Sequence, residues 1–243
     1  MRLILISDTH TMHRSKSFNK HLTDLIDPNQ DNILIHAGDF SGTGTESQVT
    51  DFVYWYQNLK GFDTKIFIAG NHELTFESKP AWLFNYINEE NLSQSDCVYL
   101  EDEEYIIQTP EFSRPIKIYG TPWQPVFLDW AFNLPRNGQA LEEKWNKIPN
   151  DTDILISHCP PYGIGDYLNY KNLGCELLRK RVDKLNLLLN VFGHIHDGRG
   201  GKYVNDTLYV NASICTEEYY PVNKPFVVDL KEIDGIIKTN VIL

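Results

Sequence analysis

Five short apolar runs, each followed at once by a polar cluster, constrain the fold of this 243-residue chain more than any other feature. The runs lie at 3–6, 33–35, 65–69, 154–156 and 187–192, and the clusters after them lie at 7–10, 36–39, 70–73, 157–158 and 193–196. Each run has the length of a strand and is rich in Leu or β-branched residues, which is typical of a sheet buried on both faces. The pattern predicts buried strands whose polar followers gather at one edge of one sheet.

The stretches between these runs add a second kind of element. Segments 46–59 and 80–88 predict helices, the latter with Pro80 where a first turn accepts proline. Strands that alternate with helices indicate βαβ units, in which ligands collect beyond the carboxyl ends of the strands. Segments 105–108, 116–119, 208–211, 226–230 and 236–243 read as further strands, which predicts a second sheet packed on the first. The fold class is therefore α/β (α+β), and with no linker in sight we expect one domain over 1–243.

The overall charge excludes several kinds of partner. The chain carries 22 Lys and Arg against 33 Asp and Glu, a formal charge of −11. Long nucleic acids and anionic membrane surfaces need clustered basic residues, so we expect neither as a partner. A small anionic substrate stays compatible with this charge, because bound divalent cations invert the local field.

Cysteine usage and the N-terminus point to a cytoplasmic protein. The four cysteines form no Cys-x-x-Cys pair, which favours reduced thiols over a zinc knuckle. The apolar run at 3–6 is too short for a signal peptide or a membrane span and is better explained as a first strand.

The five polar clusters together supply seven side chains that suit divalent metals. Carboxylate, amide oxygen and imidazole are ligands for ions such as manganese, iron or zinc. The seven candidates are Asp8, His10, Asp39, Asn71, His158, His194 and His196. Seven donors exceed the need of one tetrahedral site and suit two metals that share a bridging carboxylate.

The histidines are distributed unevenly along the chain. Apart from His36, five of the eight fall in the motifs of these clusters, namely His10, His72, His158, His194 and His196, although turn chemistry alone does not require histidine. We interpret His13 and His21 as surface residues. His36, just before Gly38 and Asp39, is interpreted as a buried, hydrogen-bonded neighbour of the site.

The motifs resemble, in identity and in order, those of the calcineurin-like metallophosphoesterase superfamily. They are Asp8-x-His10, Gly38-Asp39, Gly70-Asn71-His72-Glu73, His158 and Gly193-His194-x-His196. Segments 70–76, 120–125, 131–136 and 144–149 resemble one branch, the small metallophosphoesterase-domain proteins with brain-expressed animal members and bacterial relatives. The run at 38–44 departs from the protein phosphatases, which read Gly-Asp-x-Val-Asp-Arg-Gly, because the second Asp and the Arg are missing.

The resemblance implies a four-layer α-β-β-α sandwich of two facing mixed sheets, and it assigns the ligands. One metal would take Asp8, His10 and His196; the other would take Asn71, His158 and His194; Asp39 would bridge them. Manganese is the expected ion, with iron, zinc or nickel as alternatives. The family places His72 outside the ligand set and close to the phosphate.

A metal-activated hydroxide would attack phosphorus, and the leaving oxygen then needs a proton. His72 is the candidate general acid; the alternative is that it hydrogen-bonds a metal-bound water. Glu73, Asp166 and Asp197 are candidates for the carboxylate that orients it.

Three further residues are candidates for substrate contacts. Trp123, in a turn-rich loop, and Tyr162, after the turn at 158–161, could each stack on a nucleotide base. The alternative for Trp123 is packing beneath its own loop. Arg136 could hold a phosphate as a bidentate donor, or form an ordinary surface ion pair.

The sequence therefore favours a phosphodiesterase for small organic phosphodiesters, with cyclic nucleotides as one candidate. A phosphomonoesterase is the alternative, and a nuclease is a more distant one. A different class, the non-catalytic scaffold, would be expected to lose metal ligands, whereas all seven and His72 are present. The sequence makes no prediction of an oligomeric state.

Overall fold

Two six-stranded mixed sheets form the centre of the computed structural model, which describes residues 1–89 and 96–243. The first sheet has the order β16-β15-β1-β2-β3-β4 and contains β1 (Arg2–Ile6), β2 (Asn32–His36), β3 (Thr64–Phe67), β4 (Cys97–Tyr99), β15 (Phe226–Ile233) and β16 (Ile236–Val241). The second has the order β13-β14-β12-β9-β6-β5 and contains β5 (Glu103–Ile107), β6 (Ile116–Thr121), β9 (Ile154–Ser157), β12 (Leu189–Phe192), β13 (Gly200–Val204) and β14 (Thr207–Asn211). Two small ribbons pair β7 (Gln124–Pro125) with β8 (Asn133–Leu134), and β10 (Tyr167–Leu168) with β11 (Lys171–Asn172).

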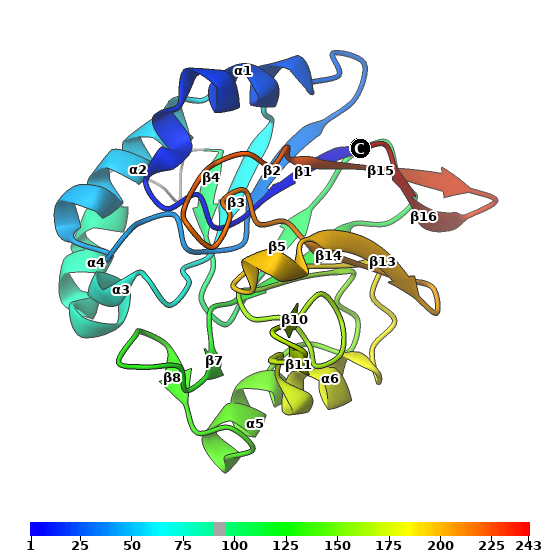
Figure 1. Ribbon diagram of the computed structural model, residues 1–243. Helices are drawn as coiled ribbons and strands as arrows, with labels where there is room; N and C mark the ends of the chain where they lie inside the picture. The colour runs from blue at the N-terminus through cyan, green and yellow to red at the C-terminus, as the bar shows by residue number, and fades with distance from the viewer. Residues whose placement is uncertain (90–95) are drawn as a thin grey trace.

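The helices cover the outer faces of the two sheets (Figure 1). The first sheet packs against α1 (Lys16–Asp24), α2 (Glu46–Asn58), α3 (Leu74–Ser78) and α4 (Pro80–Glu89). The second sheet packs against α5 (Gln139–Asn146) and α6 (Glu176–Val182). The predicted α-β-β-α sandwich is confirmed.

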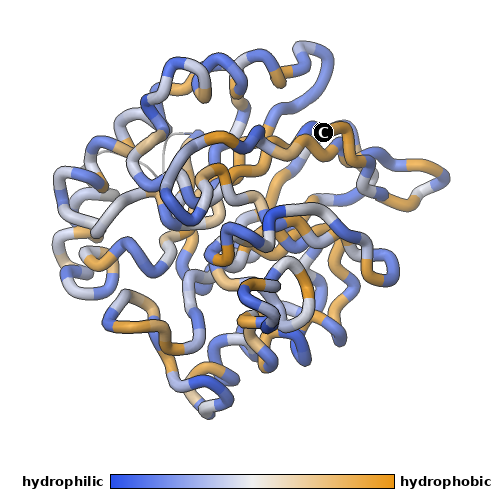
Figure 2. Tube along the Cα trace, in the orientation of Figure 1, coloured by the Kyte–Doolittle hydropathy of each residue, from blue (hydrophilic) through white to orange (hydrophobic). Residues whose placement is uncertain are grey.

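Strand β1 shows why the apolar runs are continuous. Leu3 and Leu5 point into the core between the sheets, whereas Ile4 and Ile6 point into the core beneath the helices. Successive side chains of a strand alternate between faces, so a strand buried on both sides needs apolar residues at every position. In Figure 2, hydrophobic colouring is concentrated on the central strands, whereas the outer helices and loops show a mixture with many hydrophilic positions.

The polar clusters come from two sheets, so the expectation of one edge of one sheet is wrong. Strands β1, β2 and β3 are parallel neighbours in the first sheet, and β9 and β12 are parallel neighbours in the second. The two carboxyl edges meet where the Ser7 N–H donates to the Ala212 carbonyl (3.0 Å). Strands of both sheets are buried on both faces, so their sequences look alike.

The C-terminal strands correct a second expectation. Segments 226–230 and 236–243 form β15 and β16, which extend the first sheet antiparallel to β1. Apolar alternation predicts a strand but does not identify its neighbour, and here the chain returns to pair with its own beginning. Segments 105–108, 116–119 and 208–211 do belong to the second sheet, as β5, β6 and β14.

The two predicted helices are confirmed. Helix α2 begins after Thr45, whose side chain accepts a hydrogen bond from the Gln48 N–H (3.3 Å), and it ends one residue before the predicted bound. Helix α4 begins at Pro80 as predicted. Within the described residues, no helix combines the length and the apolar character needed to cross a membrane.

Candidate metal centre

The loops that follow five strands bring the seven predicted side chains together. Four of the seven, Asp8, His10, Asp39 and His194, adopt a left-handed backbone, with φ between 39° and 67°. This conformation is uncommon for residues other than glycine, although Asp and His tolerate it better than most. Such strain, of order 1 kcal/mol or more per residue, is concentrated at functional sites and turns the side chains toward a common point.

The first cluster contains Asp8, His10 and His196, whose donor atoms all lie within 4.8 Å of one another. The Nε2 atoms of His10 and His196 are 3.2 Å apart, and His196 Nε2 lies 3.2 Å from Asp8 Oδ1. His10 Nδ1 faces the Ser41 carbonyl at 3.2 Å, and His196 Nδ1 faces the Thr216 carbonyl at 2.9 Å. A carbonyl can only accept, so each Nδ1 carries the hydrogen and each Nε2 turns a lone pair toward the cluster.

The second cluster contains Asp39, His158 and His194, again within 4.8 Å. His158 Nε2 lies 3.3 Å from Asp39 Oδ2 and 3.0 Å from Asn71 Oδ1, while its Nδ1 donates to the Ala37 carbonyl (2.9 Å). Asp39 also shares a group with His10 and His72. It therefore faces both clusters.

These contacts leave the site electrostatically incomplete without a cation. His10 and His196, and likewise His158 and Asn71, place two acceptors at hydrogen-bond distance with no donor hydrogen between them. In the metal-free protein a proton fills this gap. Burial alone would lower the pKa of His158 and of His196, but Asp39 and Asp8, respectively, raise each to about 9. The chemistry of the donor set, two buried carboxylates with imidazole and amide groups, fits a divalent cation.

Glu73 links the loop that follows β2 to the loop that follows β3. Its Oε2 accepts the backbone N–H groups of Asp39 (2.9 Å) and Gly70 (2.6 Å). Its Oε1 accepts the N–H (2.9 Å) and hydroxyl (2.7 Å) of Ser41. Burial, together with the nearby Asp39 carboxylate, raises the pKa of Glu73 to about 7. Glu73 therefore positions the loops and is not the carboxylate that orients His72.

A backbone carbonyl orients His72. Its Nδ1 lies 2.6 Å from the Gly42 carbonyl, and its Nε2 lies 3.9 Å from Asp39 Oδ2, on the side of the metal cluster. The Asp166 carboxylate instead accepts the N–H groups of Gly163 and Gly174. Across the described residues, the only polar partners of the His72 ring are Gly42 and Asp39, so neither Asp166 nor Asp197 fills the expected role.

Three aromatic side chains that the sequence analysis did not single out lie next to the two clusters. The Trp130 ring stacks on His72 with centroids 4.1 Å apart and planes 23° from parallel. The Tyr219 ring lies 4.5 Å from that of His10, and the Phe127 ring 5.8 Å from that of His194. All three belong to loops without periodicity. Phe127 and Trp130 lie just before the branch motif at 131–136, whereas Tyr219 has no such sequence signal.

Two of the three predicted substrate residues, Trp123 and Arg136, have other side-chain partners in this structure. Trp123 donates to Asp102 (3.1 Å), and the ammonium of Lys144 lies over its ring, 3.8 Å from the centroid. Arg136 forms an ion pair with Glu176 (2.7 Å) and also donates to two backbone carbonyls. Tyr162 is 40% exposed. Their contact with a substrate stays a prediction.

The remaining histidines divide differently from expectation. His36 is buried and hydrogen-bonded to Thr9 (2.9 Å), as predicted. His21 is exposed, also as predicted. His13 is only 1% exposed and contacts Asp51 (3.0 Å), so the surface interpretation of His13 is wrong. Its short 3-10 turn, Met12–Arg14, turns the ring inward against Trp55 and Phe52.

At two positions next to the clusters, the backbone lies so close to a ligand side chain that only glycine fits. A Cβ at Gly193 would collide with the carboxylate of Asp8, and one at Gly70 would collide with the carboxylate of Asp39. Only a hydrogen leaves room for these ligands in their observed positions.

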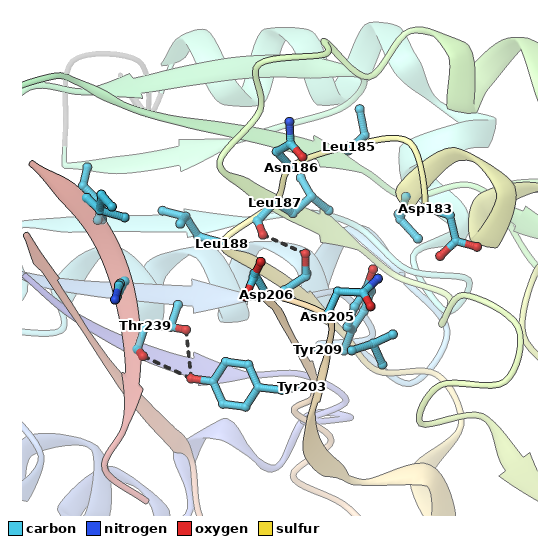
Figure 3. A pocket seen from close by; sticks show the side chains of 16 residues that line it. Asp183, Leu185, Asn186, Leu187, Leu188, Tyr203, Asn205, Asp206, Tyr209 and Thr239 are labelled. Atoms are coloured by element: carbon cyan, nitrogen blue, oxygen red, sulfur yellow. Dashed lines mark hydrogen bonds between the residues drawn. The ribbon is translucent and has the colours of Figure 1, made fainter.

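A cavity of about 710 Å³ lies at the opposite edge of the second sheet (Figure 3). Leu187 and Leu188, which precede β12, and Thr207, which begins β14, line it. The metal clusters follow the other end of β12. The lining contains Asp183 and Asp206 but no His or Cys, so this cavity lacks the donor set of the metal centre.

Comparisons with known proteins agree with this geometry. The model of the calcineurin-like phosphoesterase family matches residues 1–198. The chain is 43% identical over 252 residues to human "Metallophosphoesterase domain-containing protein 1", covering 94% of this chain and 71% of that protein. It is 25% identical to a "Probable glycerophosphodiester phosphodiesterase GpdQ" of Arcobacter nitrofigilis, over 81% of this chain and 72% of that one.

Solved structures show the same fold. The phosphopantetheinyl hydrolase PptH of Mycobacterium tuberculosis superposes with a TM-score of 0.60 at 17% identity, covering 98% of this chain and 95% of that chain. The family match over most of the chain, the 43% identity and the converging Asp and His donors lead to one conclusion. The chain belongs to the calcineurin-like phosphoesterase family, and so to the phosphoric ester hydrolases.

Proposed function

We propose that this protein is a dinuclear metal-dependent phosphodiesterase that hydrolyses small organic phosphodiesters. The observation that carries the proposal is the pair of donor clusters whose lone pairs converge and which share Asp39. Asp8, His10 and His196 would hold one divalent ion, and Asn71, His158 and His194 the other. Manganese is the proposed ion, with iron, zinc or nickel as alternatives. When bound, such a pair supplies hydroxide near neutral pH and offsets the charge of the phosphate.

His72 is proposed to protonate the leaving oxygen. Its Nδ1 hydrogen is committed to the Gly42 carbonyl, so the proton that it can deliver is the one on Nε2, which faces the cluster. The stacked Trp130 ring and the Gly42 carbonyl together hold the imidazole plane. In the alternative role His72 would hydrogen-bond a water at the metals. Replacing His72 would then lower the rate by the same factor whatever the leaving group.

The choice of a diester over a monoester follows from charge. In the described part of the chain, no Lys or Arg side chain forms an ion pair or hydrogen bond with His72 or with any of the seven donors. A monoester is largely a dianion at neutral pH, whereas a diester carries one negative charge and one further ester arm. A site without cationic side chains suits the diester better. The name of the Arcobacter relative, a probable glycerophosphodiester phosphodiesterase, supports the same choice.

The test is hydrolysis of bis-p-nitrophenyl phosphate and p-nitrophenyl phosphate by metal-stripped protein with Mn²⁺ added back. Asp39→Asn is the test variant. Asp183→Asn is the matched control, because that carboxylate is 46% exposed and, among the described residues, forms an ion pair with Arg179 alone. Manganese-dependent turnover that favours the diester and is lost only in Asp39→Asn is the expected result. Turnover of the monoester alone would establish the phosphomonoesterase, and no turnover with any divalent metal would favour the scaffold.

A second comparison separates the two roles of His72. We expect His72→Gln to slow phenyl esters, which have a poor leaving group, by at least tenfold more than p-nitrophenyl esters. Equal losses with both would assign His72 to the water instead.

We further propose a reducing, cytoplasmic location. All four cysteines are buried and lie outside any disulfide bond, which is the state expected where thiols stay reduced.

A further inference from the structure

Tyr219 occupies the end of the metal centre formed by the first cluster. Its ring centroid is 4.5 Å from that of His10 and 6.1 Å from that of His196, yet the side chain is 44% exposed. Its backbone is left-handed, with φ 63°. For a bulky aromatic residue this conformation is a true outlier, and the surrounding structure must enforce it.

The same loop that holds a metal-ligand candidate also holds Tyr219. The Thr216 carbonyl accepts hydrogen bonds from both His196 Nδ1 and the Tyr219 N–H, each at 2.9 Å. The Thr216 hydroxyl in turn faces the N–H groups of Glu218 and Tyr220. Tyr219 is thus fixed to the frame of the first cluster.

Phe127 occupies the other end, at the second cluster. Its ring centroid is 5.8 Å from that of His194, and the side chain is 50% exposed. Asn133 fastens this loop, because its side chain bonds the N–H and the carbonyl of Phe127, both at 3.2 Å. The loop is also tied to the metal centre, since the Ala131 N–H donates to the Asn71 carbonyl (3.0 Å).

Two half-exposed aromatic rings at the two ends of one polar cluster call for an explanation. Neither is needed to fill the core, and each leaves apolar surface in water beside a charged site. A phosphodiester has two ester arms that leave phosphorus in different directions. Since no Lys or Arg of the described residues forms an ion pair or hydrogen bond with the donors, we expect the arms to provide much of the selectivity.

We propose that Phe127 and Tyr219 are the two walls of the substrate site and select phosphodiesters with a flat aromatic ring on an ester arm. This inference rests on the proposed phosphodiesterase function and names its substrate class. Ring stacking is worth about a tenfold preference for such an arm. Trp130 differs from this pair, because its ring already stacks on His72 and it acts as a positioning residue.

The test compares two diesters with the same leaving group, phenyl p-nitrophenyl phosphate and methyl p-nitrophenyl phosphate. The readout is the ratio of their kcat/KM values, from which differences in folding or metal content cancel. The test variants are Tyr219→Leu and Phe127→Leu. The first control is Tyr219→Phe, which keeps the ring. The second is Tyr220→Leu, at the next residue in the chain, whose tyrosine side chain is 64% exposed.

We expect each Leu variant to lower the phenyl-to-methyl ratio about fivefold, and both controls to keep the wild-type ratio. An unchanged ratio in both Leu variants, with both esters still hydrolysed, would overturn the inference and leave the phosphodiesterase intact.

A binding measurement separates the two proposals. Calorimetry of phenylphosphonate and methylphosphonate with the Mn²⁺-loaded protein needs no turnover. We expect the phenyl compound to bind about tenfold more tightly to wild type, and this advantage to be lost in Tyr219→Leu. If wild type cleaves neither ester, the proposed function fails, and the phosphonate comparison alone decides the inference. Equal affinity of wild type for the two phosphonates would refute it.

Discussion

Replacing Glu73 by Gln tests the idea that one buried side chain holds the ligand loops in place. The carboxylate has two acceptor oxygens, one facing the N–H groups of Asp39 and Gly70, the other facing the N–H and hydroxyl of Ser41. Gln has almost the same shape but offers a single acceptor oxygen. Its amide nitrogen must therefore face a buried N–H group.

The cost follows from the better of the two amide orientations. With the nitrogen at the Oε2 position, two backbone donors lose their acceptor. With the nitrogen at the Oε1 position, only the Ser41 N–H loses its acceptor, since the Ser41 hydroxyl can turn to accept from the amide. One buried, unpaired N–H costs roughly 1–3 kcal/mol, and this range is the predicted loss in the free energy of unfolding.

Urea unfolding of the metal-free protein measures this loss, because chelator removes any contribution of bound metal. Glu46→Gln is the control: that side chain is 43% exposed and pairs with Lys79, so its loss should stay within about 0.5 kcal/mol. The slope of free energy against urea should be the same for all three proteins. If Glu73→Gln unfolded at the same urea concentration as wild type, the four hydrogen bonds would not hold the loops as described.

Three other perturbations test the metal centre directly. His10→Ala should reduce metal content by about one equivalent per chain in elemental analysis; full occupancy would remove this histidine from the ligand set. The pKa values of His158 and His196 are raised to about 9, so their protonated forms stabilise the metal-free fold below pH 6.5, and that stability is lost as pH rises through 9. The Tm in chelator should fall over this window and metal uptake should release protons; a flat Tm would contradict both pKa shifts. Gly193→Ala should weaken Mn²⁺ binding at least tenfold by titration calorimetry, whereas Gly201→Ala, where a Cβ would make only ordinary van der Waals contacts, should not. Equal affinities would show that the loop can yield.

The donor residues were predictable because their chemistry and their position coincide. Asp39 and His158 each follow a strand that is buried on both faces. Such strands can be recognised in a sequence by a continuous run of apolar residues. Asp, Asn and His at five strand ends have no common structural reason other than ligation. The motif order then identified the family.

The features that escaped prediction depend on backbone groups and on pairing between distant segments. The carbonyl of Gly42, which orients His72, has no signature in side-chain sequence. Trp130 and Tyr219 lie on loops whose paths are set by local hydrogen bonds to backbone groups rather than by a repeat. The assignment of β15 to the first sheet depends on pairing with β1 across more than 200 residues, and apolar alternation carries no record of the partner.

The division of the donors between two sheets has a consequence for the lifetime of the folded chain. His196 meets Asp8 across 188 positions of sequence, and His158 meets Asn71 across 87. A cation bound at either cluster would link the two sheets much as a covalent cross-link does. Unlike a covalent bond, this link is reversible, and its occupancy depends on the free metal concentration. At a free metal concentration of 100 times Kd, such binding adds about 2.7 kcal/mol to the free energy of unfolding. When metal becomes scarce this contribution is lost, so we expect the metal-free chain to unfold more readily and to be cleaved faster by a protease.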